Sequence, residues 1–205
     1  VRYAVDVGGG ARPIHGMVGV RNRAGLADAS EAVAETVAAF VDRDVSPLVP
    51  EVGMNVVGAP AYAETVDDVV ALDGRLRRTL DGVAPARGVR AGASSHVARF
   101  LLAAREFDPS LRFAVNCRYD DDVEAALSSL PWSVARYDRR DQPDSVREEE
   151  GNTMGWGARR AFGDRDSSPV AVADPGDVGK EPIVKLVAND AETLRARTFE
   201  LLDAC

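Results

Sequence analysis

Apolar residues recur at helical spacing in several stretches of the chain, and this period predicts the helices. The first helix is expected to open at Asp28, with Glu31 as its capping-box partner and Pro47 and Pro50 beyond its end. Its apolar face consists of Val33, Val37, Phe40 and Val41. Further helices are expected over 95–106, 120–130, 152–162 and 191–202, and a short one over 67–72. Asn152 is a candidate N-cap, and the face of the 95–106 helix holds Val97, Phe100, Leu101 and Ala104.

Between these helices lie short runs of β-branched and apolar residues, which predict strands. They cover 75–80, 112–119, 132–137, 170–172 and 183–187, and residues 50–57 form another strand-like run. Strands that alternate with helices favour an α/β class with a central sheet covered on both faces. The start of the chain is different: the glycines at 8–10 match no phosphate-binding fingerprint and are interpreted as a linker.

Charge restricts the classes of partner. The chain has 33 acidic residues against 25 Lys and Arg, a net charge of −8, and lysine only at Lys180 and Lys185. An acidic, lysine-poor surface fits a protein kept soluble in a salt-rich cytosol, although a GC-rich genome would also favour arginine over lysine. The acidic balance argues against binding to nucleic acid.

Cysteine and hydropathy patterns indicate a cytoplasmic protein. Cys117 and Cys205 lie far apart and form no disulfide framework. No apolar run is long enough for a bilayer, and the N-terminus lacks the pattern of a signal peptide. Two histidines exclude a metal site of three histidines.

The sharpest chemical motif is the run GASSHVAR at 92–99, where small residues lead into a helix. A helix N-terminus offers free N–H groups and a partial positive charge, which suit an anion. Ser94 and Ser95 add hydroxyls, and His96 in the first turn can bind phosphate or move a proton. The alternative is that Ser94 only caps the helix and His96 is a surface residue.

Two more motifs suit anions. Gly179 and Lys180 lie in a glycine-rich turn after a strand, and Arg139 and Arg140 follow Asp138 at a strand end. Arginine guanidinium groups match phosphate oxygens. The alternatives are a plain loop and a solvated run of charges.

Two further segments could face a ligand. Met154 and Trp156 lie among glycines and could form a flat pocket for a heterocycle, or pack in the core. Asn55 is polar within an apolar run and either satisfies backbone groups or reaches a ligand. No acyl-transfer motif is present, so the candidates together suit chemistry in which a phosphate-bearing group is held or leaves.

These motifs in this order resemble the ThiN family of thiamine-phosphate synthases. The resemblance extends from about residue 50 to 187 and rests on PEVGMN, DGRL, GASSHVAR, NCRYDD, YDRRDQP, EGNTMGWG and GDVGKEP. Residues 1–25 resemble the end of a hydroxymethylpyrimidine phosphate kinase and a linker, which leaves 26–205 as the synthase domain. The resemblance implies a three-layer α/β/α sandwich with a mixed sheet, like that of AraD-type class II aldolases but without their zinc ligands.

The resemblance also implies a reaction: hydroxymethylpyrimidine diphosphate and thiazole phosphate give thiamine phosphate and pyrophosphate. By motif, the critical arginine and histidine of the family fall on Arg75 and His96. Substrate-binding residues are then expected at Asn55, Ser94, Ser95, Arg99, Asp138, Arg139, Arg140, Met154, Trp156, Gly179 and Lys180. Magnesium is expected as cofactor, with Asp138, Asp174 and Asp177 as its candidate ligands.

The alternative within the family is a non-catalytic domain that senses thiamine phosphates for a transcriptional regulator. The presence of both Arg75 and His96 favours the enzyme. A homodimer is the default expectation, and the kinase domain is expected in cis or in trans.

Overall fold

The computed structural model describes residues 15–143, 146, 152–163 and 165–205. Its sheet has seven strands in the order β5-β2-β1-β6-β9-β8-β7, and a separate hairpin consists of β3 and β4. The bounds are β1 Val56–Gly58, β2 Val70–Leu72, β3 Leu76–Thr79, β4 Gly82–Pro85, β5 Val89–Ala91, β6 Phe113–Arg118, β7 Val134–Arg136, β8 Ala171–Asp174 and β9 Ile183–Ala188. Neighbouring strands of the large sheet are antiparallel except β7 and β8, which are parallel, so the expected mixed sheet is confirmed.

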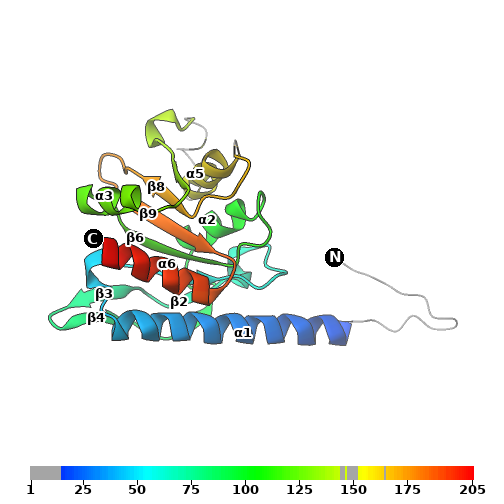
Figure 1. Cartoon of the computed structure of the whole chain (residues 1–205). Coiled ribbons are helices and arrows are strands. Elements are labelled where there is room, and N and C mark those ends of the chain that lie inside the picture. The colour runs from blue at the N-terminus through cyan, green and yellow to red at the C-terminus, as the bar shows by residue number, and fades with distance from the viewer. Residues whose placement is uncertain (1–14, 144–145, 147–151, 164) are drawn as a thin grey trace, which may run out of the picture.

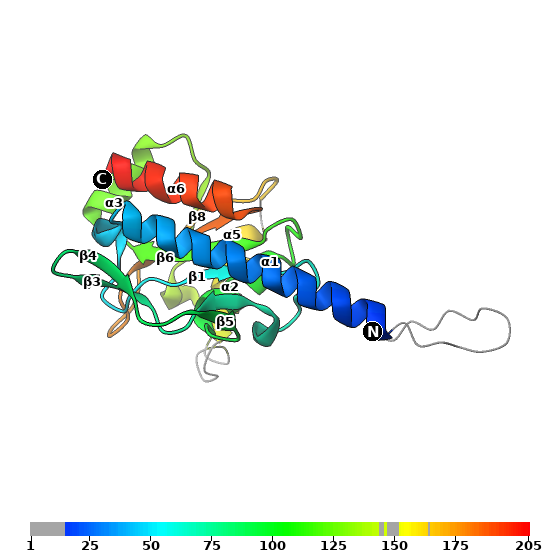
Figure 2. The same cartoon turned by 90° about the horizontal axis from the view of Figure 1, so that it is seen from below.

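Helices cover both faces of this sheet (Figure 1). One face carries α1 (His15–Asp42), α6 (Ala191–Ala204) and α3 (Asp121–Ser129), and Figure 2 shows α1 beside α6. The other face carries α2 (His96–Ala104) and α5 (Asn152–Phe162), which pack against each other. The chain is therefore a three-layer sandwich, as expected, whereas its likeness to aldolases stays a prediction. Among the described residues, no helix is long and apolar enough to cross a membrane.

Two apolar cores, one on each face of the sheet, stabilise the sandwich. Phe40, Leu186 and Leu194 are fully buried in the first core, and Phe100 and Leu101 in the second. Every residue of β6, the strand predicted over 112–119, is buried except Arg118. The reason is that helices cover this central strand from both sides, so neither face of β6 meets water.

Several predicted boundaries are wrong. Helix α1 begins at His15 rather than Asp28, so the capping box does not form. The division into residues 1–25 and 26–205 stays a prediction. Val41 is 37% exposed, although it was assigned to the apolar face of this helix. Residues 67–72 do not form one helix: a 3₁₀ turn at Val66–Asp68 leads into the buried strand β2. The glycines at 8–10 lie outside the described residues.

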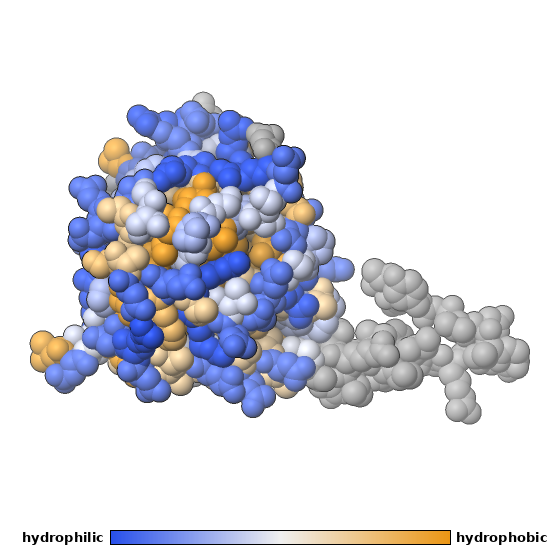
Figure 3. All heavy atoms as spheres, viewed as in Figure 1, coloured by the Kyte–Doolittle hydropathy of each residue, from blue (hydrophilic) through white to orange (hydrophobic). Residues whose placement is uncertain are grey.

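On the surface seen in Figure 3, hydrophilic residues surround smaller apolar patches. This distribution agrees with the charge-rich composition of the chain. The exposed large apolar side chains among the described residues are scattered: Val41, Val52, Leu80, Phe107 and Val178.

Candidate functional site

A cavity of about 710 Å³ lies between the start of α2, the end of β8 and the loop that follows β8. It brings together most of the residues singled out in the sequence. These are Asn55, Arg75, Ser94, Ser95, His96, Arg139, Met154, Asp174, Gly179 and Lys180. Four cations and two carboxylates line it, with Glu181 as the second carboxylate, so the lining is positive in a chain of net charge −8. Both lysines of the chain belong to it.

Arg75 is held in the cavity wall by the backbone around it. Its Nη1 donates a hydrogen bond to the carbonyl of Val52 at 2.6 Å. The side chain lies across Gly53, where a Cβ would come within 2.9 Å of the Cβ of Arg75. Gly53 has a φ of 86° and Gly74 a φ of 88°, so both adopt left-handed backbone that favours glycine. This backbone aims the arginine and explains the glycines of PEVGMN and DGRL.

Asn55 holds the same wall in place through hydrogen bonds to the backbone. Its Nδ2 donates to the carbonyls of Leu72 at 3.1 Å and Gly74 at 3.0 Å. Its backbone N–H donates to Oδ1 of Asn116 at 2.7 Å. The sequence left two roles open for Asn55, to satisfy backbone groups or to reach a ligand. The buried side chain does the first, and it also lines the cavity.

His96 is the first residue of α2, and Ser95 precedes the helix with helical backbone angles. The side chain of Ser95 makes no capping hydrogen bond, and Ser94 does not occupy the capping position. The start of α2 lines the cavity, and no serine side chain caps its first N–H groups. The pKa of His96 lies below its usual value, first because of burial and then because of the cations Arg75, Arg99, Lys180 and Lys185. A neutral imidazole at neutral pH follows, with one N–H to donate.

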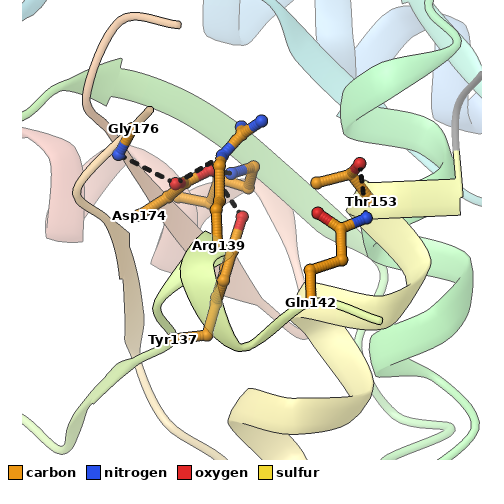
Figure 4. Close-up of polar contacts among 7 residues, drawn as sticks. Tyr137, Arg139, Gln142, Thr153, Asp174 and Gly176 are labelled. Carbon is orange, nitrogen blue, oxygen red and sulfur yellow. Dashed lines mark hydrogen bonds and ion pairs between the residues drawn. The ribbon is translucent and has the colours of Figure 1, made fainter. Parts of the chain in front are cut away.

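Asp174 and Arg139 form a buried ion pair at the end of β8 (Figure 4). Nε and Nη2 of Arg139 donate to the carboxylate at 2.9 and 2.7 Å. Tyr137 donates its hydroxyl at 2.6 Å and Gly176 its backbone N–H at 3.0 Å. Beside them, Gln142 donates to the hydroxyl of Thr153 at 2.9 Å, which fixes the start of α5.

Several predicted residues lie elsewhere. Asp138 and Arg140 form an exposed ion pair with each other, and the hydrogen bonds from Arg140 lower the pKa of Asp138 to about 2. Neither lines the cavity. Arg99 and Trp156 line a neighbouring hollow of about 480 Å³ between α2 and α5, and Trp156 packs edge-on against Tyr137 with centroids 5.7 Å apart. Asp177 accepts the N–H of Val178 in the turn that carries Lys180.

The three aspartates proposed as metal ligands do not form a cluster. Among the described residues, no group of three or more His, Cys, Asp or Glu side chains could hold a metal ion. Both oxygens of Asp174 already accept hydrogen bonds, and Asp138 is paired outside the cavity. The side chains that the structure describes therefore do not fit a resident magnesium site.

The sequence interpretation missed two buried polar residues of the cavity, Asn116 and Lys185. Both are nine-tenths or more buried and lie within the apolar strands β6 and β9. A lone polar residue inside an apolar strand was the available signal, and it was used only for Asn55. Buried polar groups need partners, so such positions often face a site.

Comparison with known proteins agrees with this geometry. A family model described as "Thiamine-phosphate synthase ThiN" matches residues 32–198. The chain is 35% identical over 159 residues to the thiamine-phosphate synthase ThiN of Methanothermobacter thermautotrophicus, an alignment that covers 78% of this chain and 84% of that one. It is 32% identical over 145 residues to the bifunctional thiamine biosynthesis protein ThiDN of Methanocaldococcus jannaschii, which covers 70% of this chain but only 33% of that protein.

A solved structure is similar to this chain over most of its length. The crystal structure of the C-terminal domain of a phosphomethylpyrimidine kinase superposes with a TM-score of 0.80 at 30% identity, and covers 85% of this chain and 98% of that one. The family match spans well over half of the chain, and the cavity lies within it. The chain therefore belongs to the ThiN family of thiamine-phosphate synthases and is an enzyme of the transferase class.

Proposed function

We propose that this enzyme joins hydroxymethylpyrimidine diphosphate to thiazole phosphate in thiamine biosynthesis and releases pyrophosphate. The observation that carries the proposal is the convergence of Arg75, Arg139, Lys180 and Lys185 on one cavity that also receives the start of α2. Two phosphorylated substrates need several cations at one place, and this acidic chain concentrates its only two lysines there.

The reaction needs charge stabilisation and positioning rather than a nucleophilic side chain. The bond between the pyrimidine methylene carbon and the diphosphate oxygen breaks, and its electron pair stays with the oxygen. The lone pair of the thiazole nitrogen then forms the new C–N bond, and no oxidant or proton transfer is required. In this scheme Arg75 binds diphosphate oxygens, and His96 donates an N–H to a phosphate oxygen beside the start of α2.

Apolar residues would hold the heterocycles between these charged groups. Met154, Val97 and Ile183 line the cavity together with the polar residues. Met154 is a flexible, polarisable side chain suited to a flat ring. Trp156 lies in the neighbouring hollow instead, so its role would be to support Tyr137 from outside the cavity.

Magnesium enters this proposal only as the counter-ion that accompanies the diphosphate substrate. The described carboxylates do not fit a resident metal, so no step is assigned to one. The kinase that supplies the diphosphate is proposed to act in cis or in trans, because the ThiDN relative is bifunctional. A homodimer and the fold likeness to aldolases stay predictions.

An assay of product formation tests the proposal directly. The chain, in molar KCl with magnesium, is mixed with both substrates, and thiamine phosphate is measured as thiochrome fluorescence. We expect product with the wild-type chain, none with Arg75→Ala or His96→Ala, and unchanged product with Arg77→Ala, an exposed arginine outside the cavity lining. No product but saturable binding of thiamine phosphate would identify a sensor and overturn the proposal.

A further inference from the structure

A row of polar side chains crosses the sheet beneath the cavity. Asn116 of β6 pairs directly with Lys185 of β9, and residues opposite each other in an antiparallel pair project from the same face. Asn55 continues the row, because its N–H is hydrogen-bonded to the side chain of Asn116. All three line the cavity, so the sheet itself contributes a polar floor to the site.

Lys185 occupies an unusual position in this row. Its side chain is only 3% exposed, and its Nζ lies 5.2 Å from the ring centre of Phe100 and 5.9 Å from that of Tyr137. The carboxylate of Asp174 is 3.8 Å away, too far for a hydrogen bond. Within the part of the chain that the structure describes, no acceptor hydrogen-bonds this ammonium, which has three N–H groups to donate.

Asp174 cannot serve as a dedicated partner for Lys185. Its two oxygens already accept four hydrogen bonds, two of them from the guanidinium of Arg139. Two buried cations thus share one carboxylate, and a buried cation without its own counter-charge is costly. An anion that enters the cavity would supply the missing charge and acceptors.

We propose that Lys185 is a further catalytic residue of this site, whose ammonium binds the substrate diphosphate and neutralises the pyrophosphate as it leaves. The inference rests on the proposed function. When the C–O bond breaks, the electron pair remains on the diphosphate oxygen, and the ammonium stays protonated and stabilises that charge. Lys185 acts from the sheet, whereas His96 acts from the start of α2.

The surrounding charges are consistent with this role. Burial lowers the pKa of Lys185 to about 8, Asp174 opposes this shift and Arg139 adds to it. Lys185 in turn lowers the pKa of His96. An anion placed among these groups would raise the pKa of Lys185 and keep its ammonium protonated during the reaction.

Calorimetry with inorganic pyrophosphate tests the residue without turnover. Lys185→Met keeps the apolar stem between the two rings but removes the charge, and Lys185→Arg keeps the charge. We expect Lys185→Met to bind pyrophosphate at least tenfold more weakly and to lose kcat/KM to a similar extent, and Lys185→Arg to recover part of both. The control is Arg43→Met on the opposite layer, which removes a surface cation paired with Asp203 and should change neither. A folded Lys185→Met chain with wild-type affinity would overturn the inference.

A second measurement covers the case in which Lys185→Met does not fold. In a Lys180→Arg chain Lys185 is the only lysine. Pyrophosphate should slow the reductive methylation of Lys185 several-fold compared with chloride at equal ionic strength. An unchanged labelling rate would refute contact between Lys185 and pyrophosphate. The two proposals fail separately: pyrophosphate binding through Lys185 without synthesis overturns the proposed reaction alone, whereas normal synthesis by Lys185→Met overturns only the role of Lys185.

Discussion

Arg139 binds the carboxylate of Asp174 through two parallel hydrogen bonds, of 2.9 and 2.7 Å, at the edge of the cavity. Asp174 is completely buried, and the side chain of Arg139 is 13% exposed. An ion pair removed from water in this way is stabilising only while both partners are present. The pair therefore joins the end of β8 to the segment after β7 and holds the cluster around Tyr137 together.

Asp174→Asn should destabilise the protein severely. The change removes the buried carboxylate that Arg139 and Lys185 share, and breaking such a pair costs about 3–5 kcal/mol. The measurement is denaturant unfolding in molar KCl. Asp138→Asn is the matched control, because it removes an exposed carboxylate that is also paired with an arginine, and it should leave the midpoint unchanged. Equal effects of the two changes would refute the role assigned to the buried pair.

The same pair sets a pH dependence of stability. Burial raises the pKa of Asp174, but the hydrogen bonds from Arg139 and Tyr137 and the charge of Lys185 outweigh it, so the pKa is lowered overall. A lowered carboxyl pKa contributes stability that is fully present above the unfolded value of about 3.9, and this stability is lost as pH falls through the folded value. The wild-type chain should therefore have a higher free energy of unfolding than the Asp174→Asn chain from neutral pH down to about pH 4. Below pH 4 this difference should shrink.

The sequence predicted the long periodic elements well. The expected helix over 152–162 matches α5, and the expected strand over 183–187 matches most of β9. Two short strands were missed, because β2 and β5 each contain three residues, too few to show a period. Their conformation is fixed by pairing with distant strands, which no local pattern records.

The residues of the candidate site were also predicted only in part. A helix start and a glycine-rich turn identified His96 and Lys180 as cavity residues, since loops and helix starts carry their own sequence signals. Arg75 was assigned from the family resemblance. Register between strands placed Asn116 beside Lys185, and register is a tertiary property. Arg99 was assigned to the site from its motif alone, but it follows His96 by three residues and lies in the neighbouring hollow.

Gly53→Ala should impair catalysis more than it impairs folding. An alanine at a φ of 86° is strained by about 1–2 kcal/mol, and its Cβ would lie 2.9 Å from the Cβ of Arg75. Because Arg75 must move, kcat/KM should fall at least tenfold while the chain stays folded. Gly88→Ala is the control: its Cβ meets no atom within 4 Å, so activity should be retained. Full activity of Gly53→Ala would show that the position of Arg75 is not critical.

His96 should take up a proton when an anion enters the cavity. In the free protein, burial and the surrounding cations hold its pKa below 6.5, so the imidazole is neutral at pH 7. A bound diphosphate would offset those cations and raise the pKa, since a nearby anion favours the charged form. By linkage, pyrophosphate should then bind more tightly as pH falls through the bound and free pKa values.

Because the chain has only two histidines, the protonation of His96 can be followed by NMR. The chain gives signals from His15 and His96 only, and His96→Gln assigns them. We expect the NMR titration of His96 to move to higher pH with saturating pyrophosphate, while that of His15 stays fixed. Calorimetry in two buffers of different ionisation enthalpy should show the matching proton uptake as pH falls below neutral, and the uptake should vanish in His96→Gln. An unchanged His96 titration would mean that the anion binds beyond its reach, and the imidazole would then have no part in holding the leaving group.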